Sequence, residues 1–110
     1  MLFKPNHIYL IKAGIKTETR RAWKGKPKVK IGRIYPIMRN YRNKHNQDDG
    51  YILIKKLWQQ RLGDITEQEA QAEGGYTLNE YKQIWIDING SWNDDKIVWV
   101  VDFEFKKYKV

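Results

Sequence analysis

The feature that most constrains the fold is the apolar segment at residues 96–105, Lys-Ile-Val-Trp-Val-Val-Asp-Phe-Glu-Phe. This segment is rich in β-branched and aromatic residues, and its second half alternates between apolar and polar side chains, which predicts a strand. A second apolar segment at residues 50–58 predicts another strand. The longest fully apolar piece, residues 97–101, is far too short to span a membrane. We therefore expect two strands of a sheet and no contact with a membrane.

Two helices are predicted between these strands. Thr66 precedes a run that contains acidic residues, which favour a helix N-terminus, and the glycine pair at residues 74–75 ends the run. Thr77 and Glu80 form the capping box of a second helix, which ends at the Asn-Gly pair of residues 89–90. The apolar stripe of that helix consists of Tyr81, Ile84, Trp85 and Ile88.

The first half of the chain carries shorter signals. Residues 7–13 are compatible with a short helix or a strand, and residues 16–21 alternate, which favours an extended chain. A basic loop over residues 24–30 is followed by a predicted strand at 31–38, in which Pro36 implies a sheet edge or a bulge. The order is a set of strands, two inserted helices and a closing strand. We therefore expect an α+β fold around a small β-barrel.

The composition agrees with one domain over residues 1–110. Hydrophobic residues make up 41% of the chain, with five Trp and seven Tyr, which is too many core formers for a disordered chain. No cysteine is present, and His7 and His45 lack the spacing of metal ligands, so we expect no metal and no cofactor. The N-terminus lacks the apolar region of a secretory signal. We expect a cytoplasmic protein that is a monomer or a weak dimer.

The net charge of +8 is unevenly distributed along the chain. Residues 1–61 carry 16 Lys and Arg against three acids, whereas residues 62–110 carry five Lys against ten acids. A basic half beside an acidic half favours a partner that carries phosphates. The alternative is that lysine-rich loops only keep the protein soluble.

The densest basic cluster includes an aromatic residue, which favours RNA as the partner. Arg and Trp can stack on unpaired bases while lysines hold phosphates. The candidate nucleic-acid-binding residues are Arg20, Arg21, Trp23, Lys24, Lys26, Lys28, Lys30, Arg33, Arg39 and Arg42. Trp23 stands in a polar loop, where it either stacks on a base or forms a lid over the end of the barrel. We expect single-stranded or loop RNA across the basic half, with a base or nucleoside in a cleft between residues 16–21 and the predicted helices.

The segment Gly14-Ile-Lys-Thr-Glu-Thr-Arg-Arg21 resembles the Gly-x-Lys-x-x-(Thr/Glu)-x-Arg signature of ASCH domains. The resemblance continues through residues 29–35, the helical region 63–80 and the apolar strand 98–105, and so covers nearly the whole chain. It implies a β-barrel related to the PUA fold of RNA-binding proteins. Members of the ASCH family are thought to bind RNA or to cleave it, and one bacterial branch hydrolyses N4-acetylcytidine.

Carried onto this chain, the catalytic set of that bacterial branch corresponds to Lys16, Thr19 and Glu73. Amide hydrolysis requires a nucleophile, a proton acceptor and stabilisation of an oxyanion. Thr19 is the candidate nucleophile, and Lys16 is the candidate base if burial or a nearby arginine lowers its pKa. Glu73 would then orient Lys16 or move a proton. In an extended chain positions 16 and 19 point to opposite faces, so the set requires a bulge or a turn.

Three functions remain open from the sequence. The first is an RNA- or nucleoside-binding domain, in which Lys16 and Arg21 hold phosphate and Thr19 lies on a sheet surface. The second is an amidohydrolase that acts on N4-acetylcytidine or a related acylated nucleoside. The third is a ribonuclease, which would require His7 and His45 to converge.

Overall fold

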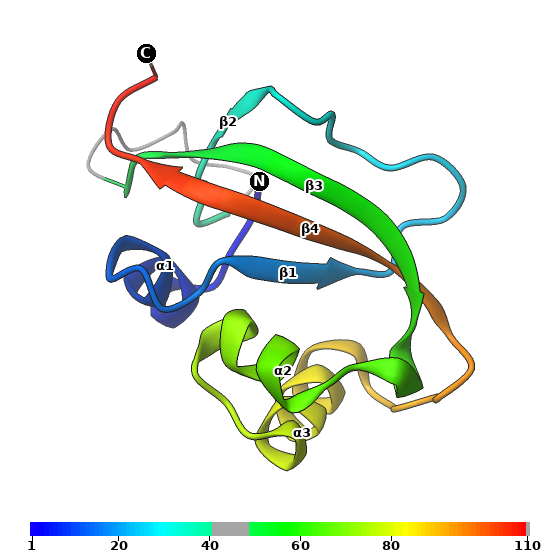
Figure 1. Ribbon diagram of the computed structural model, residues 1–110. Helices are drawn as coiled ribbons and strands as arrows, with labels where there is room; N and C mark the ends of the chain where they lie inside the picture. The colour runs from blue at the N-terminus through cyan, green and yellow to red at the C-terminus, as the bar shows by residue number, and fades with distance from the viewer. Residues whose placement is uncertain (41–48, 110) are drawn as a thin grey trace.

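In the computed structural model, which describes residues 1–40 and 49–109, four antiparallel strands form one sheet in the order β1-β4-β3-β2 (Figure 1). The strands are β1 (Glu18–Arg21), β2 (Ile34–Pro36), β3 (Tyr51–Arg61) and β4 (Ile97–Lys106). The two strands predicted from the apolar segments are β3 and β4, and they pair with each other along their whole length at the centre of the sheet. Pro36 lies on β2, which is an edge strand as expected, because proline cannot donate to a second neighbour.

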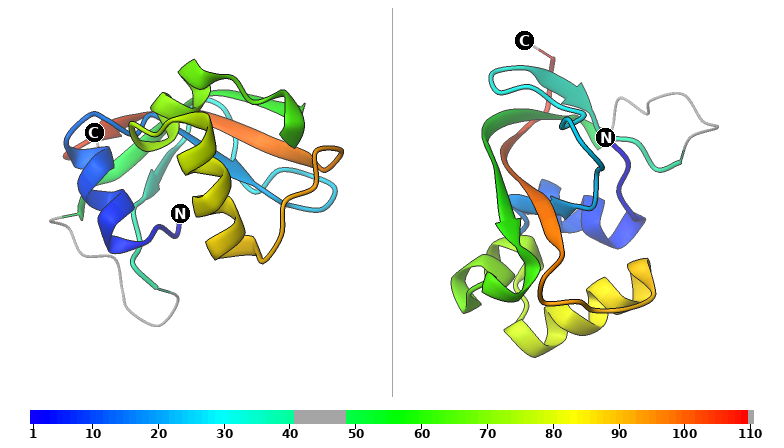
Figure 2. Two further views of the ribbon diagram at one scale, coloured as in Figure 1. Left: turned by 90° about the horizontal axis from the view of Figure 1, so that it is seen from below. Right: turned by 90° about the vertical axis from the view of Figure 1, so that its right-hand side faces the viewer.

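The sheet curls into a half-barrel and does not close within the described part of the chain (Figures 1 and 2). The register of β3 against β4 shifts between Ile54 and Lys56, and such irregularities bend and twist a sheet. The edge strands β1 and β2 do not pair with each other. The expected barrel is therefore present as an open half-barrel, and its relation to the PUA fold stays a prediction.

The helices are α1 (Pro5–Lys12), α2 (Glu67–Gly74) and α3 (Leu78–Asn89), with a short 3-10 turn η2 (Leu62–Asp64) before α2. Both predicted helices are confirmed between β3 and β4, and each begins with a complete capping box. Both end at a glycine in the left-handed conformation, Gly75 and Gly90. The segment left open between helix and strand is α1, which begins with proline at its first position. None of the described helices is long and apolar enough to cross a membrane.

The buried apolar side chains form two clusters. One packs α1 against the sheet and includes Phe3, Ile11 and Phe103, while the other packs α2 and α3 around Tyr81 and Trp85. All three helices lie at the β1 end of the sheet, away from β2 (Figure 1). The fold therefore places α1, α2 and α3 around an edge strand that carries three of the predicted site residues, Thr19, Arg20 and Arg21.

Candidate functional site

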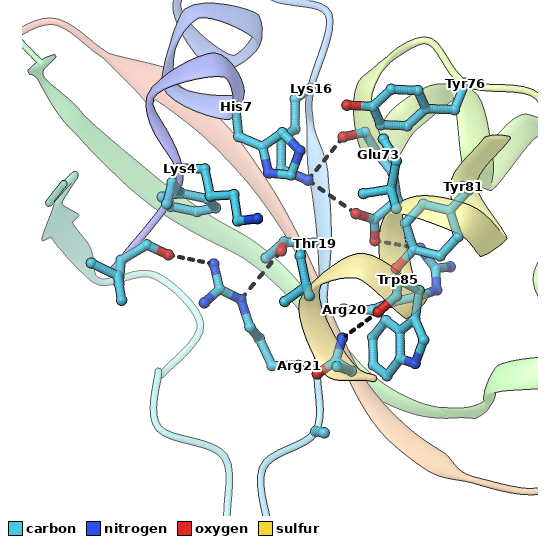
Figure 3. Close-up of a pocket in the computed structure, with 16 residues that line it drawn as sticks. Lys4, His7, Lys16, Thr19, Arg20, Arg21, Glu73, Tyr76, Tyr81 and Trp85 are labelled. Carbon is cyan, nitrogen blue, oxygen red and sulfur yellow. Dashed lines mark hydrogen bonds and ion pairs between the residues drawn. The ribbon is translucent and has the colours of Figure 1, made fainter. Parts of the chain in front are cut away.

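A cavity of about 270 Å³ lies between β1, α1, α2 and α3, where the two apolar clusters meet (Figure 3). Its cationic side chains are Lys4, Lys16, Arg20 and Arg21, and its ring side chains are Phe3, His7, Tyr76, Tyr81 and Trp85. Thr19 and Glu73 also line it. The cavity therefore combines charged groups with aromatic surface, and it lies where the sequence predicted a cleft.

Lys16 is held in the wall of the cavity by three hydrogen bonds. Its Nζ donates to the Glu18 carbonyl at 2.9 Å, to the Glu73 carbonyl at 2.8 Å and to Glu73 Oε1 at 3.0 Å. Only 2% of the Lys16 side chain and 4% of the Glu73 side chain are exposed. An ammonium group has three N–H bonds, so these three acceptors use all of its donors.

Arg20 joins the same network from β1 and is fully buried. Its Nη1 donates to Glu73 Oε2 at 2.9 Å, its Nη2 donates to Glu69 Oε2 at 2.7 Å, and its Nε donates to Gln60 Oε1 at 3.0 Å. Glu18 Oε1 lies 2.7 Å from Nη1, without the geometry of a hydrogen bond. The buried network thus contains two cations and three carboxylates, which satisfies the rule that buried charges are paired.

Burial shifts several pKa values in this network. Burial lowers the pKa of Lys16, although the adjacent Glu73 carboxylate opposes the shift. Burial also raises the pKa of Glu18. Burial and the nearby Glu73 carboxylate both raise the pKa of Tyr81. The direction for Lys16 is the one that a proton acceptor requires, whereas its three donated hydrogen bonds stabilise the charged form.

Thr19 and Arg21 lie on the other face of β1, and both are fixed in place. The Thr19 hydroxyl accepts a hydrogen bond from Arg21 Nε at 3.3 Å, and Arg21 Nη2 donates to the Leu2 carbonyl at 2.8 Å. The guanidinium carbon of Arg21 lies 4.8 Å from the centre of the Phe3 ring, which is a cation–π contact. Because the Thr19 oxygen accepts from a cation, negative charge on that oxygen would be stabilised.

The three predicted catalytic residues line one cavity, although they are not all in contact. Lys16 and Glu73 are paired, whereas none of the three hydrogen bonds from Lys16 reaches Thr19. The alternation of an extended chain was expected to keep the side chains of Lys16 and Thr19 on opposite faces. Lys16 precedes β1, which begins only at Glu18 and is an edge strand, so this alternation does not separate the two residues. Side chains from both of its faces therefore reach the cavity.

The predicted nucleic-acid-binding residues occupy three different environments. Arg20 is buried among carboxylates, so a phosphate would have to displace one of them to reach it. Arg21 lies in the cavity wall, and Trp23 is half-buried and packs against the first apolar cluster. Both interpretations of Trp23, a stacking residue and a lid, stay predictions. Arg39 is exposed and makes two hydrogen bonds to Asp49.

The remaining candidates of this group lie mainly in the loop between β1 and β2. The exposed residues there are Lys24, Lys26, Lys28, Lys30 and Arg33. Trp99 Nε1 donates to the Gly25 carbonyl at 3.1 Å, which ties this loop to β4. Arg42 and His45 lie outside the described residues. The loop is therefore the most accessible group of cations among the predicted binding residues.

Sequence reasoning missed several side chains of the cavity, above all His7 and Tyr76. His7 is the third residue of α1, and Pro5 at the first position was an available signal that a helix begins there. Tyr76 stands between two helices and carries no periodic signal. Tyr81 and Trp85 belong to the predicted apolar stripe of α3, which did not reveal that they also border a cavity.

Comparison with known proteins identifies the fold. No protein family model matches the sequence, and no curated protein matches it either. An ASCH domain structure from Lactobacillus crispatus JV V101 matches with a TM-score of 0.64 and 16% identity, over 90% of this chain and 69% of that one. A DUF984 protein structure from Enterococcus faecalis V583 matches with a TM-score of 0.63 and 19% identity, over 90% of this chain and 66% of that one. The chain thus spans about two thirds of each neighbour, and it has the fold of an ASCH domain.

Proposed function

We propose that the protein binds single-stranded or loop RNA, or a free nucleoside, and that the cavity beside β1 receives one base. The observation that carries this proposal is the cavity itself, which places Tyr76, Tyr81 and Trp85 opposite Lys4 and Arg21. Unpaired bases are recognised by stacking on aromatic or guanidinium planes and by hydrogen bonds to their edges. The cavity supplies both kinds of group.

The exposed lysines of the β1–β2 loop would hold the phosphates of a longer RNA. Lys24, Lys26, Lys28 and Lys30 alternate with other residues in a loop that begins directly after β1. Ala22, the first residue of that loop, lines the cavity, so the loop continues from the cavity wall. A base in the cavity and a backbone on the loop are therefore compatible with one bound strand. Binding through phosphates weakens steeply as salt is added.

A matched pair of charge-reversal variants tests this proposal. The variant Lys26→Glu/Lys28→Glu/Lys30→Glu reverses three of the five exposed loop cations, and Lys96→Glu/Lys107→Glu/Lys109→Glu changes the net charge equally at exposed sites elsewhere. We expect the first variant to lose at least about tenfold in affinity for a fluorescent single-stranded RNA, and to show a shallower salt dependence than the control variant. Equal affinities of the two variants would contradict RNA binding by the loop. Gel analysis of the same RNA after incubation tests for cleavage by a ribonuclease.

A second candidate function, hydrolysis of an acylated nucleoside, is favoured by the convergence of Lys16, Thr19 and Glu73 on one cavity. Attack by the Thr19 hydroxyl on the amide carbon would form a C–O bond and turn the carbonyl oxygen into an oxyanion, while Lys16, after losing one of its own protons, would accept the hydroxyl proton. Collapse of this intermediate would break the C–N bond, with the proton passing from Lys16 to the leaving amino nitrogen, and water would then hydrolyse the acyl ester on Thr19. Arg21, which donates to Thr19 Oγ1, would stabilise the developing negative charge. Lys16 would have to give up one of its three hydrogen bonds during this step.

Incubation with N4-acetylcytidine, followed by chromatography of released cytidine, tests this second candidate. The variant Thr19→Ala removes the nucleophile while leaving the ion network of Lys16 untouched, and Lys30→Gln is a control outside the cavity. Turnover that disappears only in Thr19→Ala supports hydrolysis. If the folded protein binds RNA but releases no cytidine, its function is restricted to binding.

A further inference from the structure

Trp99 is a half-buried tryptophan on β4 that stands apart from the apolar core. In the part of the chain that the structure describes, it belongs to neither of the two apolar clusters. Its indole N–H, the single polar group of the side chain, donates to the Gly25 carbonyl at 3.1 Å. The ring is therefore held by one edge, and its exposed part offers a ligand a π surface and no hydrogen bond.

The position of Trp99 in the sheet places it next to the cavity. Trp99 pairs with Arg21 on β1, which lies beside β4 (Figure 1), and residues that pair across antiparallel strands project from the same face. Arg21 lines the cavity, so Trp99 stands one strand beyond the cavity wall, a step of about 5 Å. Successive bases of a nucleic-acid strand are about 3.4 Å apart when stacked, and a splayed strand separates them further. The base next to one held in the cavity is therefore within reach of Trp99.

The hydrogen bond of Trp99 also positions two lysines beside the ring. Lys24 and Lys26 flank Gly25, whose carbonyl is held by Trp99, and both lysines are exposed. Val29, which is buried in the first apolar cluster, anchors the same loop further along. Among the described residues, neither Lys24 nor Lys26 forms an ion pair. Aromatic rings that stack on bases, combined with cations that follow the backbone, are the groups with which proteins bind single strands.

We propose that Trp99 is a second base site, in which the nucleotide next to the one in the cavity stacks on the indole ring while Lys24 and Lys26 hold the phosphate between the two. The inference rests on the proposed function, and it selects an RNA strand of at least two nucleotides over a free nucleoside as the preferred ligand. Stacking tolerates any base, because every base has a π face. The second base site therefore adds affinity and little sequence specificity.

Trp58 provides a matched control. It is also half-buried, it lies on the neighbouring strand β3, and in the described part of the chain it too belongs to neither apolar cluster. Trp58 pairs with Val100, the residue after Trp99, so the alternation of β4 places the two tryptophans on opposite faces of the sheet. Replacing either one with leucine removes an indole ring from the same region of the sheet. Only Trp99→Leu removes it from the face that adjoins the cavity wall and the loop.

The experiment measures binding of cytidine, the dinucleotide cytidylyl-cytidine and a cytidine tetranucleotide to the full chain at constant ionic strength. We expect the dinucleotide to bind at least about tenfold more tightly than cytidine, because one stacked base contributes about that much affinity. This preference should disappear in Trp99→Leu, persist in part in Trp99→Phe, which keeps an aromatic ring, and remain in Trp58→Leu. The variant Lys24→Gln/Lys26→Gln should reduce both the preference and its salt dependence. Cytidine, which occupies only the cavity, should bind Trp99→Leu and Trp58→Leu equally.

An NMR measurement on the wild-type protein gives a second readout that does not depend on the folding of the leucine variants. The chain has five tryptophans, and the indole N–H signal that is missing from the spectrum of Trp99→Phe belongs to Trp99. A base stacked on the ring shifts this signal through its ring current. We expect the dinucleotide to shift it and cytidine to leave it in place.

The outcomes separate the second base site from the proposed function. A preference for the dinucleotide that depends on Trp99 and not on Trp58 supports both. Equal affinities for cytidine and the dinucleotide, without a shift of the Trp99 signal, overturn the second base site and leave the base in the cavity. Equal losses in the two leucine variants show a structural effect and also overturn the second base site. Tetranucleotide binding that depends on Trp99, without binding of cytidine, supports the contact at Trp99 and overturns the base in the cavity.

Two further outcomes concern the kind of partner. Binding of none of the three probes overturns both the second base site and the proposed function. A polyglutamate peptide that binds as tightly as the tetranucleotide, with the same dependence on Trp99 and the two lysines, would assign this surface to an acidic protein and overturn RNA as its ligand.

Discussion

Replacing Glu73 with glutamine should destabilise the fold strongly, because Glu73 is the partner of a buried ammonium group. Its carboxylate lies 3.0 Å from Lys16 Nζ and 2.9 Å from Arg20 Nη1, and its side chain is 4% exposed. Arg20 retains Glu18 and Glu69 in the variant, whereas Lys16 retains only two carbonyl oxygens. The loss should therefore arise mainly at Lys16.

The magnitude follows from breaking one buried ion pair. Removing one partner of such a pair costs about 3–5 kcal/mol, and the lower end applies here because Lys16 can lose its proton. A loss of about 3 kcal/mol is a large part of the roughly 5–15 kcal/mol that stabilises a domain. It corresponds to a fall in melting temperature of about 12 °C, at roughly 4 °C per kcal/mol.

The pH dependence of this loss has a definite sign. Burial lowers the pKa of Lys16 in the folded protein below its ordinary value of 10.5, and removal of Glu73 lowers it further. A neutral amine does not need a carboxylate, so the difference between wild type and Glu73→Gln should shrink as the pH rises towards 10. A constant difference between pH 6 and pH 10 would show that the charge of Lys16 is not responsible.

Urea unfolding followed by tryptophan fluorescence measures the free energy of unfolding of each variant. The control is Asp64→Asn, which breaks the exposed Arg61–Asp64 pair, whose atoms are 2.8 Å apart but whose side chains are 42% and 61% exposed. That variant should lose less than about 1 kcal/mol. The double variant Lys16→Met/Glu73→Gln should lose less than the sum of the two single variants, because it leaves no unpaired buried charge. A Glu73→Gln loss no larger than that of Asp64→Asn would refute the reasoning.

Three further predictions concern single positions. The pKa of His7 is about 4 in the folded protein and 6.5 in the unfolded chain, so its contribution to stability is present above pH 6.5 and is lost as the pH falls. Urea unfolding should therefore show that wild type loses about 2 kcal/mol more than His7→Gln between pH 7 and pH 5. Thr77→Ala removes the hydroxyl that accepts from the Glu80 N–H at 3.2 Å, and thermal unfolding should show a loss of about 1 kcal/mol. Gly50→Ala should lower the free energy of unfolding by more than about 1 kcal/mol in the same measurement, because Gly50 has φ +76° and an added Cβ would lie 2.6 Å from the Phe105 ring. For each of these three variants, unchanged stability would contradict the prediction.

The elements predicted correctly are those that depend on neighbouring residues. The start of α3 was predicted from the capping box of Thr77 and Glu80, and the start of α2 from the acidic residues that follow Thr66, because both signals involve residues within one helical turn. The apolar segments of β3 and β4 predicted the two central strands for the same reason. Residues 7–13 stayed open between helix and strand because seven residues with mixed apolar spacing satisfy both periods. The curling of the sheet into an open half-barrel involves a register shift between β3 and β4, which are distant in the chain, and no local pattern reports such a shift.

The candidate site was decided largely by tertiary structure. Lys16 and Glu73 were named from a family resemblance, and only the folded chain brings them to 3.0 Å across 57 positions of sequence. Arg20 and Arg21 are adjacent and looked equivalent as RNA contacts. The alternation of β1 turns them to opposite faces, so that one is buried among the carboxylates of α2 while the other enters the cavity wall with Thr19.

By itself the sequence determined α2 and α3, the central strands and the excess of positive charge in the first half of the chain, because these follow from periodicity, capping and composition. The tertiary structure decided which of those charges are buried, which remain on the surface and which face a cavity. The physical reason is that burial and pairing depend on what packs against a side chain. For His7, those neighbours are Lys16, Arg21 and Glu73, which lie between 9 and 66 positions away in the chain.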